Sequence, residues 1–544
     1  MPTSTARGSR WLTALAVVAL AMAGCKKSTT RNPDSPDYST VHTTEDPTNN
    51  ADQEVLGDGI DNDGDGLVDC EDDEFALWEG TPDAATLPEV CRGGDLPVCL
   101  DGDLTVSSAD LMNAETLGCI AQVSGRLLIG YDEIPVPFNV PIPCEAHSDI
   151  PAIDGLSALQ VVEGRVAIRC LPQLTELGGL PALTWAKALR IEEVDSLTLV
   201  SGLPELAVLE GDLVLPKRGN IAEITGLNAL RIIEGDLGSD SNPLTDISGL
   251  GALESVGNLT FEWSQLADLS DLQSLTVVGG EFVILSNAQM VSLNLPSLGS
   301  IGSMTLANER LLRLDLDAHP TVTGTLILGN ADLQSLDGLQ GVVSLDAIEM
   351  THNDALTSLS GLDNLETADT IELTWNESLI NLNGLEALNE VTTELLIVQN
   401  NRLVDVDALQ NLHTVEWIEF TSNSALRSVA GLSGLVDVDL VYMNSNSVLE
   451  TLPVWSLSSL SQSLFLSNND SLTSLDGLQS LQTIGYELSL RGNAQLADVT
   501  ALHGLISTPR VEITDNPVLT DAAAWALVDA IDQEPDSVGI VGNN

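Results

Sequence analysis

From about residue 104 to the end, the chain repeats one short pattern of apolar and polar positions every 21 to 24 residues. Each unit starts with a strand-like L-x-L or I-x-L triplet, clearest at residues 371–373, 464–466 and 488–490. An Asn follows about three residues later, and then a stretch close to L-x-x-L-x-G-L-x-x-L. Such a repeat is typical of solenoids, in which each unit buries its apolar face against its neighbours.

One polar position keeps its phase through these units. Parallel strands of successive coils lie about 4.8 Å apart with apolar side chains inside, so a regular polar residue at the corner needs a reason. An inward Asn can bond backbone groups that would otherwise be buried without partners. We therefore predict a structural asparagine ladder, and no ligand site, at Asn287, Asn308, Asn330, Asn353, Asn376, Asn400, Asn423, Asn446, Asn469, Asn493 and Asn516.

The pattern changes towards both ends of the repeat region. Residues 131–150 interrupt one turn with four prolines and Cys144, and the units near Val194, Arg218 and Ser264 lack the Asn. Residues 521–532 are apolar at helical spacing and precede a last strand at 538–540 and Asn543. A helix there would cap the open end of the stack. The predicted fold is mainly β, a right-handed parallel β-solenoid with a short C-terminal capping helix.

Residues 99–106 (CLDGDLTV) and 118–125 (GCIAQVSG) place cysteines before the first turns. With the repeats, they resemble the receptor L-domain, the leucine-rich-repeat-like solenoid of growth-factor receptor ectodomains and microbial surface proteins. The resemblance covers residues 99–544. Known L-domains have far fewer coils, so several such units fused end to end are expected. The resemblance implies a binding or scaffolding role.

The N-terminus has the features of an export signal. Arg7 and Arg10 precede an apolar run over residues 11–23, and small residues lead to Cys25. The run is shorter than the about 20 residues of a membrane span. The segment resembles the lipobox of bacterial lipoproteins, which implies lipidation of Cys25, and Lys26 after it implies export to the outer membrane. The alternative is an ordinary secretory signal with an incidental cysteine.

These features divide the chain into four segments. Residues 1–24 are expected to be the lipoprotein signal peptide, and residues 25–53, rich in Ser, Thr, Asp, Asn and Pro, a lipidated disordered tether. Residues 54–98 form an Asp-rich, Cys-containing segment, and residues 99–544 form the solenoid. The tether would hold the folded body away from the membrane.

A formal charge of −60 narrows the possible partners. Such acidity repels nucleic acid and anionic headgroups, so we expect no nucleic-acid partner and a membrane contact through the N-terminal lipid alone. Apart from Cys25, six cysteines remain, an even number that suggests up to three disulfides in an exported protein. The sequence does not choose among their pairings.

An acidic loop within residues 54–98 has the ligand spacing of a calcium site. Carboxylates on alternate residues, a glycine at position 6 and a backbone carbonyl at position 7 match the EF-hand loop. The flanks are poor helices, so the loop resembles the free-standing calcium motifs of exported bacterial and thrombospondin-type proteins. A solvated acidic turn is the alternative. The predicted Ca²⁺ ligands are Asp61, Asp63, Asp65, Leu67 through its carbonyl, Asp69 and Asp72.

Catalytic motifs are absent from the sequence: there is no H-E-x-x-H, G-x-S-x-G or phosphate loop. His352 beside Asn353 is expected to be structural. Trp263, Trp375 and Trp417 could stack on sugars, although packing between coils is the favoured interpretation.

We therefore predict a non-enzymatic, lipid-anchored binding or scaffold protein of the cell envelope, with an unidentified protein or glycan partner. A polysaccharide-active β-helix enzyme, a lyase or glycoside hydrolase with an acidic site, is the alternative, because such solenoids can carry paired acids. A cluster of Asp residues with Arg or Lys on one exposed face would favour the enzyme.

Overall fold

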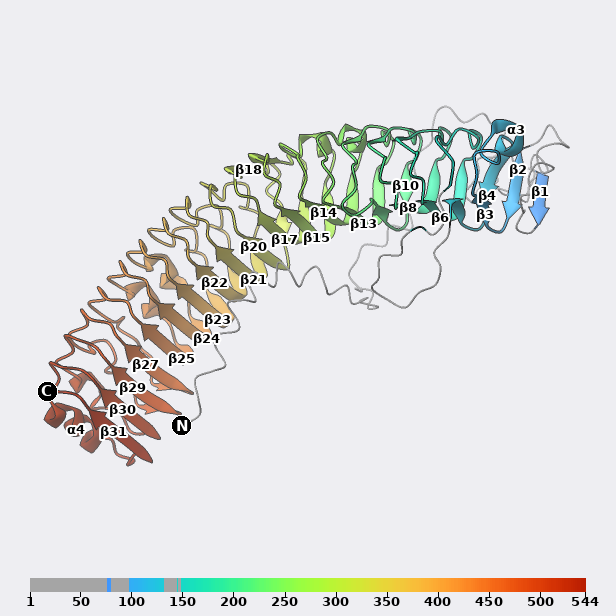
Figure 1. The fold of residues 1–544 in the computed structure, drawn as a ribbon. Helices are drawn as coiled ribbons and strands as arrows, with labels where there is room; N and C mark the ends of the chain where they lie inside the picture. Colours follow the sequence, from blue (N-terminus) through green and yellow to red (C-terminus); the bar gives the residue numbers. More distant parts are fainter. Residues whose placement is uncertain (1–75, 80–96, 132–143, 145–147) are drawn as a thin grey trace. The chain divides into compact units, whose positions relative to one another are not determined.

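A computed structural model of the chain describes residues 76–79, 97–131, 144 and 148–544 (Figure 1). All of them belong to one compact unit, Glu54–Asn544. Strands of successive coils pair in parallel along this unit, and a helix follows near its C-terminus. The structure thus confirms the predicted parallel β-solenoid with a C-terminal helix.

Among the described residues, the main sheet has 24 strands. They are β1 Ala76–Glu79, β2 Val98–Asp101, β3 Leu104–Val106, β4 Ile120–Val123, β5 Leu127–Gly130, β6 Val161–Arg169, β8 Trp185–Glu192, β10 Val208–Leu209, β11 Leu213–Val214, β13 Ile232–Asp240, β14 Ser255–Glu262, β15 Val277–Leu285, β17 Ser300–Ala307, β19 Thr321–Val322, β20 Thr325–Leu328, β21 Ser344–Thr351, β22 Thr367–Thr374, β23 Glu390–Val398, β24 Thr414–Thr421, β25 Asp437–Asn444, β27 Ser463–Ser467, β29 Glu487–Arg491, β30 Arg510–Thr514 and β31 Ser537–Val541.

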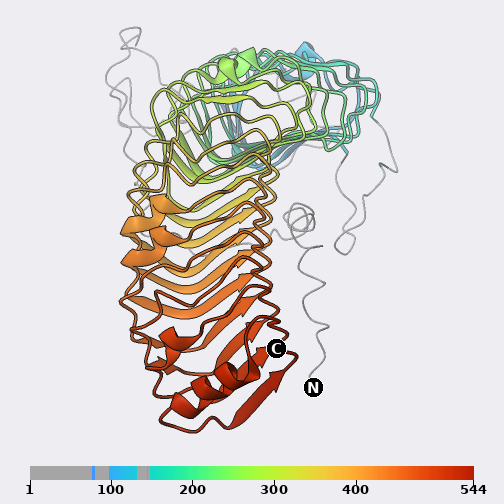
Figure 2. The same cartoon turned by 90° about the vertical axis from the view of Figure 1, so that its left-hand side faces the viewer.

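Shorter elements complete the coils. In the part of the chain that the structure describes, three small parallel sheets contain β7 Glu176–Leu177, β9 Leu199–Val200 and β12 Glu223–Ile224; β16 Ser292–Asn294 and β18 Arg313–Asp315; and β26 Ser459–Leu460 and β28 Thr483–Ile484. The helical turns are α3 Ala114–Leu117, η2 Ser248–Leu250, η3 Ser270–Leu272, η4 Asp407–Asn411, η5 Ala430–Gly434 and η6 Thr500–Leu502. Figure 2 shows the C-terminal strands of the main sheet stacked one above another.

The pairing register of the strands explains why the L-x-L and I-x-L triplets of the sequence form the core. Ile371 and Leu373 of β22 pair with Ile348 and Met350 of β21, and all four are buried. Glu372 between them is half-buried on the opposite side, since successive side chains of a strand point to opposite faces. Burial of each such aliphatic side chain contributes about 1.5–3 kcal/mol relative to exposure. One continuous cluster of buried apolar side chains follows from this repetition.

The long strands are commonly followed by a residue whose backbone φ and ψ lie in the left-handed region. Trp375, Gln399 and Ser422 have φ of 58°, 58° and 60°, although none is glycine. The backbone amides of these residues still take part in hydrogen bonding between neighbouring coils. Trp375 N donates to Val398 O at 3.1 Å, and Gln399 N donates to Thr421 O at 2.9 Å. These backbone bonds offset a conformation that costs a non-glycine residue about 1–3 kcal/mol. The repeat pattern did not predict this bend.

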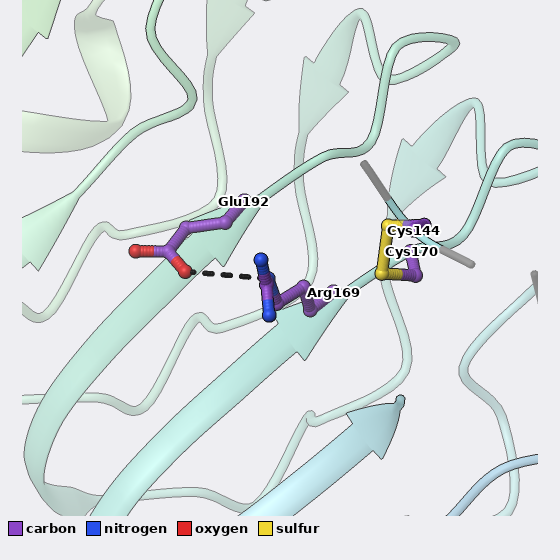
Figure 3. The surroundings of a disulfide bond; sticks show 4 residues. All are labelled: Cys144, Arg169, Cys170 and Glu192. Carbon is purple, nitrogen blue, oxygen red and sulfur yellow. Dashed lines mark ion pairs between the residues drawn. A yellow bond between two sulfur atoms is a disulfide. The ribbon is translucent and has the colours of Figure 1, made fainter. Parts of the chain in front are cut away.

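A disulfide fixes an early coil (Figure 3). Cys144 bonds to Cys170, which follows β6 and has a Cα 5.7 Å from that of Cys144. Cys99 and Cys119 are also disulfide-bonded. Beside Cys170, the buried Arg169 lies with its Nε 3.6 Å from Glu192 Oε2 on β8. The early coils therefore combine apolar packing with covalent and ionic links between neighbours.

The C-terminal helix α4, Asp521–Ala530, has a clear start. Thr520 Oγ1 accepts a hydrogen bond from Ala523 N at 3.1 Å, as an N-cap residue does. Asp521 in the first turn suits the positive end of the helix dipole. Ala524 and Leu527 are buried, so the helix covers apolar side chains at the end of the stack. β31 then pairs with β30 as the last strand of the main sheet.

Candidate ligand-binding face

The predicted lipid and calcium sites lie outside the described residues: Cys25, Asp61, Asp63, Asp65, Leu67, Asp69 and Asp72. Within the part of the chain that the structure describes, no group of three or more His, Cys, Asp or Glu residues is arranged to hold a metal ion. Over the same residues, no helix is long and apolar enough to cross a bilayer.

The asparagines lie in a buried row along one corner. Asn353 N donates to Asn376 Oδ1 at 3.0 Å, and Asn376 N donates in turn to Asn400 Oδ1 at 3.1 Å. Each Nδ2 donates to a strand carbonyl of the preceding coil: Asn287 to Phe261, Asn308 to Ile284, Asn330 to Leu306, Asn353 to Leu328, Asn376 to Met350, Asn400 to Leu373, Asn423 to Ile397, Asn446 to Phe420, Asn469 to Met443, Asn493 to Leu466 and Asn516 to Leu490.

The row extends beyond the predicted set at both ends. Asn516 N donates to Asn543 Oδ1 at 3.1 Å, and Ser264 N donates to Asn287 Oδ1 at 2.9 Å. Asn242, which the sequence analysis missed, is fully buried and donates from Nδ2 to Pro216 O at 2.8 Å. The Ser-Asn pair at 241–242 repeats the one at 422–423, a signal that could have identified it. From Asn287 to Asn516, the side-chain amides are committed to backbone contacts inside the solenoid, whereas Oδ1 of Asn242 is buried without a hydrogen-bond partner.

The opposite faces of the long strands carry a different set of side chains. Register places Ile327 of β20, Glu349 of β21, Glu372 of β22 and Leu396 of β23 in one outward column. We call the half-buried acidic, aromatic and large aliphatic residues of β20–β25 and β27 in this column and the neighbouring one the acidic–aromatic face. It consists of Ile327, Glu349, Glu372, Glu394, Leu396, Trp417, Glu419, Leu440, Tyr442 and Phe465.

Aromatic side chains gather at one end of this face. Tyr442 and Phe465 are register neighbours with ring centroids 5.8 Å apart and planes inclined by 59°. Trp417 pairs with Leu440 in the adjacent column. Beyond the end of β22, the ring of Trp375 stacks on His352 of the previous coil, again with centroids 5.8 Å apart. Trp417 therefore belongs to the face, Trp375 lies at a corner beyond it, and Trp263 follows β14 in an earlier coil and is 56% exposed.

The rest of the face contains four carboxylates, from Glu349, Glu372, Glu394 and Glu419, together with Ile327 and Leu396. Glu349 and Glu372 are direct register partners on adjacent strands, and Glu419 Oε1 accepts a hydrogen bond from Thr421 Oγ1 at 3.0 Å. Burial raises the pKa of Glu349 above its ordinary value. The strands β20–β25 and β27 contain no Lys, Arg or His.

A cluster of one arginine and two glutamates, the combination that an acidic catalytic site would need, lies further along the sheet. Arg510 of β30 contacts Glu487 Oε1 at 3.3 Å and Glu512 Oε2 at 3.0 Å. Both carboxylates are thus engaged by the same guanidinium, which is typical of a structural ion-pair network. This arrangement does not favour the polysaccharide-active alternative.

No protein-family model matches the sequence, and no curated protein matches it. An internalin from Listeria monocytogenes matches with 16% identity over 66% of this chain and 83% of its own, at a TM-score of 0.25. The mouse RP105/MD-1 complex matches with 13% identity over 87% and 84%, at 0.25.

A TLR13–ssRNA13 complex matches with 15% identity over 84% of this chain and 93% of its own, at a TM-score of 0.17. Identities this low concern the fold alone, and TM-scores this low carry no argument about partners. The functional case rests on the chain's own surface.

Proposed function

We propose that this chain is a non-catalytic binding or scaffold protein of the cell envelope, anchored in the outer membrane by lipid on Cys25. Its solenoid presents the acidic–aromatic face to a partner. The observation that carries this proposal is the clustering of half-exposed Trp417, Leu440, Tyr442 and Phe465 beside a row of carboxylates on one rigid sheet.

Physical chemistry favours binding by such a surface. Aromatic and apolar side chains that remain in partial contact with water gain free energy when a partner covers them. Interfaces concentrate their binding energy in a few aromatic residues at the centre of a patch. The backbone beneath is held by parallel strand pairing and by the buried asparagines, so little conformational entropy is lost when a partner docks.

In-cell crosslinking tests the binding role. A photoreactive phenylalanine analogue would replace Tyr442 in the full chain, with the same analogue at Thr260 as a matched control in the outward column of β14. We expect a discrete crosslinked product at position 442 and none above background at 260. Equal products at both positions, or none at 442, would contradict binding through this face.

The anchor has a separate test. We expect the parent chain to fractionate with the outer membrane and to incorporate labelled fatty acid, because residues 7–25 resemble a lipoprotein signal. Cys25→Ser should abolish both properties. If the variant remains membrane-bound and labelled, the anchor is not on Cys25.

Calcium binding at Asp61, Asp63, Asp65, Leu67, Asp69 and Asp72 is also part of the proposal. Extracellular modules of this kind bind with dissociation constants of about 10⁻⁴–10⁻³ M. Calorimetry on the full Cys25→Ser chain with its disulfides intact should show a site that Asp63→Ala with Asp65→Ala removes. The absence of heat at millimolar Ca²⁺ would exclude it.

A further inference from the structure

We infer that the C-terminal end of the solenoid binds an extended segment of another protein, which adds to the main sheet as a parallel strand beside β31 (Figure 1). The site consists of the edge of β31 that faces away from β30 and of the corner at Gly542 and Asn543. It is separate from the acidic–aromatic face, so this inference goes beyond the proposed function.

The open edge follows from the way in which β31 pairs with β30. Ser537 N donates to Pro509 O at 3.2 Å, which directs the backbone of Ser537 towards β30. Alternate residues of a parallel strand bond to the same neighbour, so the N–H and C=O groups of Val538 and Ile540 point away from β30. Among the described residues, no strand other than β30 pairs with β31. These four backbone groups therefore lie along an edge without a strand partner.

The asparagine row ends at the same edge. Asn516 N donates to Asn543 Oδ1, but within the described part of the chain neither Gly542 N nor Asn543 N has an acceptor. One coil earlier, the equivalent amides are both bonded, since Asp515 N also donates to Val541 O at 2.9 Å. A further strand, followed by a side-chain oxygen, would complete both bonds in the way that each coil completes those of the coil before it.

Apolar side chains remain partly exposed at this end. Val511 and Ile513 of β30 are at most 1% exposed, whereas their register partners Val538 and Ile540 are half-buried, and Val541 is 67% exposed. Natural edge strands are usually protected by lysine, proline or an inward charge, and terminal repeats by a polar outer surface. The sequence of β31, SVGIV, contains none of these. Its edge therefore has both the backbone groups and the apolar surface that strand addition requires.

The repeat itself specifies the segment that fits. In each coil two apolar residues alternate on the inner side of the strand, and the asparagine follows three residues after the second, as Asn516 follows Ile513. A segment with this spacing would cover Val538 and Ile540 and bring an amide oxygen to the corner. We therefore expect the form apolar-x-apolar-x-x-Asn, with affinity from the backbone hydrogen bonds and specificity from the side chains.

A second copy of this chain fits the edge poorly. Residues 511–544 contain seven acidic residues and no Lys, Arg or His. The acidic residues are Glu512, Asp515, Asp521, Asp529, Asp532, Glu534 and Asp536. Two copies that met at this end would bring like charges together, which opposes association. The occupant is therefore a strand of a different protein.

Fluorescence polarisation with a defined peptide tests the inference. The full Cys25→Ser chain would be titrated against a labelled peptide with the sequence of residues 486–494, YELSLRGNA, which has the expected spacing and one charge of each sign. We expect saturable binding. Exchange of Ser489 and Leu490 within the peptide keeps its composition but removes the alternation, and should weaken binding at least about tenfold. Equal binding of both peptides, or binding of neither, would overturn the inference.

Two variants of the protein block the edge by different means. Ile540→Pro removes an outward N–H and leaves the bonds to β30, whereas Val538→Lys keeps the backbone and places a charge at an inward position. Each should weaken peptide binding at least about tenfold, while Val541→Thr, on the exposed side of the same strand, should change it less than about twofold. Binding that survives Val538→Lys would contradict the assigned edge.

Other occupants would give different results. We expect the full chain to sediment as a monomer; a dimer that Ile540→Pro dissociates would show that a second copy occupies the edge, and the inference would be wrong. If the peptide binds only after removal of residues 28–53, the N-terminal segment of the same chain occupies it instead. Neither result affects the crosslinking test at position 442, so this inference and the proposed function fail separately.

Discussion

The coils of β6 and β8 and those from Asn287 onward share one parallel sheet but close their corners differently. After β6 and β8, the ladder position is occupied by the buried apolar residues Leu171 and Val194, and the Cys144–Cys170 disulfide supplies a covalent link. From Asn287 onward, each corner instead holds an asparagine bonded to the coils on both sides.

The outward faces of the two regions differ as well. In the early coils the middle outward column contains Ala167, Arg190, Val214 and Gly238, which are small or, in the case of Arg190, ion-paired. It continues, many coils later, as the carboxylates and aromatic rings of the acidic–aromatic face. The inward pattern of a solenoid therefore determines its fold, while each outward position is free to acquire a separate surface chemistry.

The largest expected effect comes from breaking the ladder. Asn423→Leu strands the amide of Asn400 and the carbonyl of Ile397, at about 1–3 kcal/mol for each group. Chemical denaturation should show a clear loss of stability in the later coils. The exposed Glu377→Ala serves as control and should cost less than about 0.5 kcal/mol. Identical midpoints for parent and both variants would show that the asparagines do not stabilise the solenoid.

Removal of the Cys144–Cys170 disulfide should lower the stability of the early coils alone. Cys144→Ser with Cys170→Ser releases a link across a sequence separation of 26, for which a loss of about 2–4 kcal/mol is typical. Limited proteolysis should then cut near β6 and β8 before it reaches β22. Unchanged cleavage of the early coils would mean that packing of Leu171 and Val194 suffices there.

A smaller effect of opposite sign is expected on the face itself. Burial raises the pKa of Glu349, so folding disfavours its charged form. The folded state then binds more protons than the unfolded one between the two pKa values, and stability falls as pH rises through this window. Glu349→Gln should therefore stabilise the chain at neutral pH, by about 0.5 kcal/mol, and not below the unfolded pKa.

Urea titrations at neutral and acidic pH measure this difference, with the exposed Glu377→Gln as control. A stabilisation of Glu349→Gln that persists unchanged at low pH would show that it does not come from the carboxylate charge. The same experiment asks whether the face sacrifices stability for its charge, as binding surfaces commonly do.

The sequence was sufficient for the fold because the inward positions repeat. Leu373, Asn376 and Gly384 recur in phase, and Gly384, with φ of 109°, occupies a turn where a Cβ would lie 2.1 Å from Leu359 O. The face was not predicted, because its members do not repeat: Leu396 and Glu419 occupy the same column with different chemistry. Tyr442 and Phe465 stand four residues before Asn446 and Asn469, so the repeat phase places them in register, but it does not show that their rings lie 5.8 Å apart on a half-buried face.

The position of Trp417 was likewise not predicted from the sequence. The sequence analysis grouped it with Trp263 and Trp375 and favoured packing between coils. In the structure the three are separated: Trp417 belongs to the outward face, Trp375 stacks on His352 at a corner, and Trp263 stands in an earlier coil. Similar spacing of residues along the chain does not show on which side of a strand each side chain lies, since a shift of one position moves it to the opposite face.

Native-state hydrogen exchange on the intact chain tests most directly the claim that the two regions are held by different means. We predict that reduction of the disulfides accelerates exchange in β6 and β8 and leaves β22–β25 protected. Asn423→Leu should produce the reverse, with faster exchange around Asn400 and Asn446 and none added in β6. If either perturbation loosens both regions equally, the solenoid is one cooperative unit and the division proposed between them is wrong.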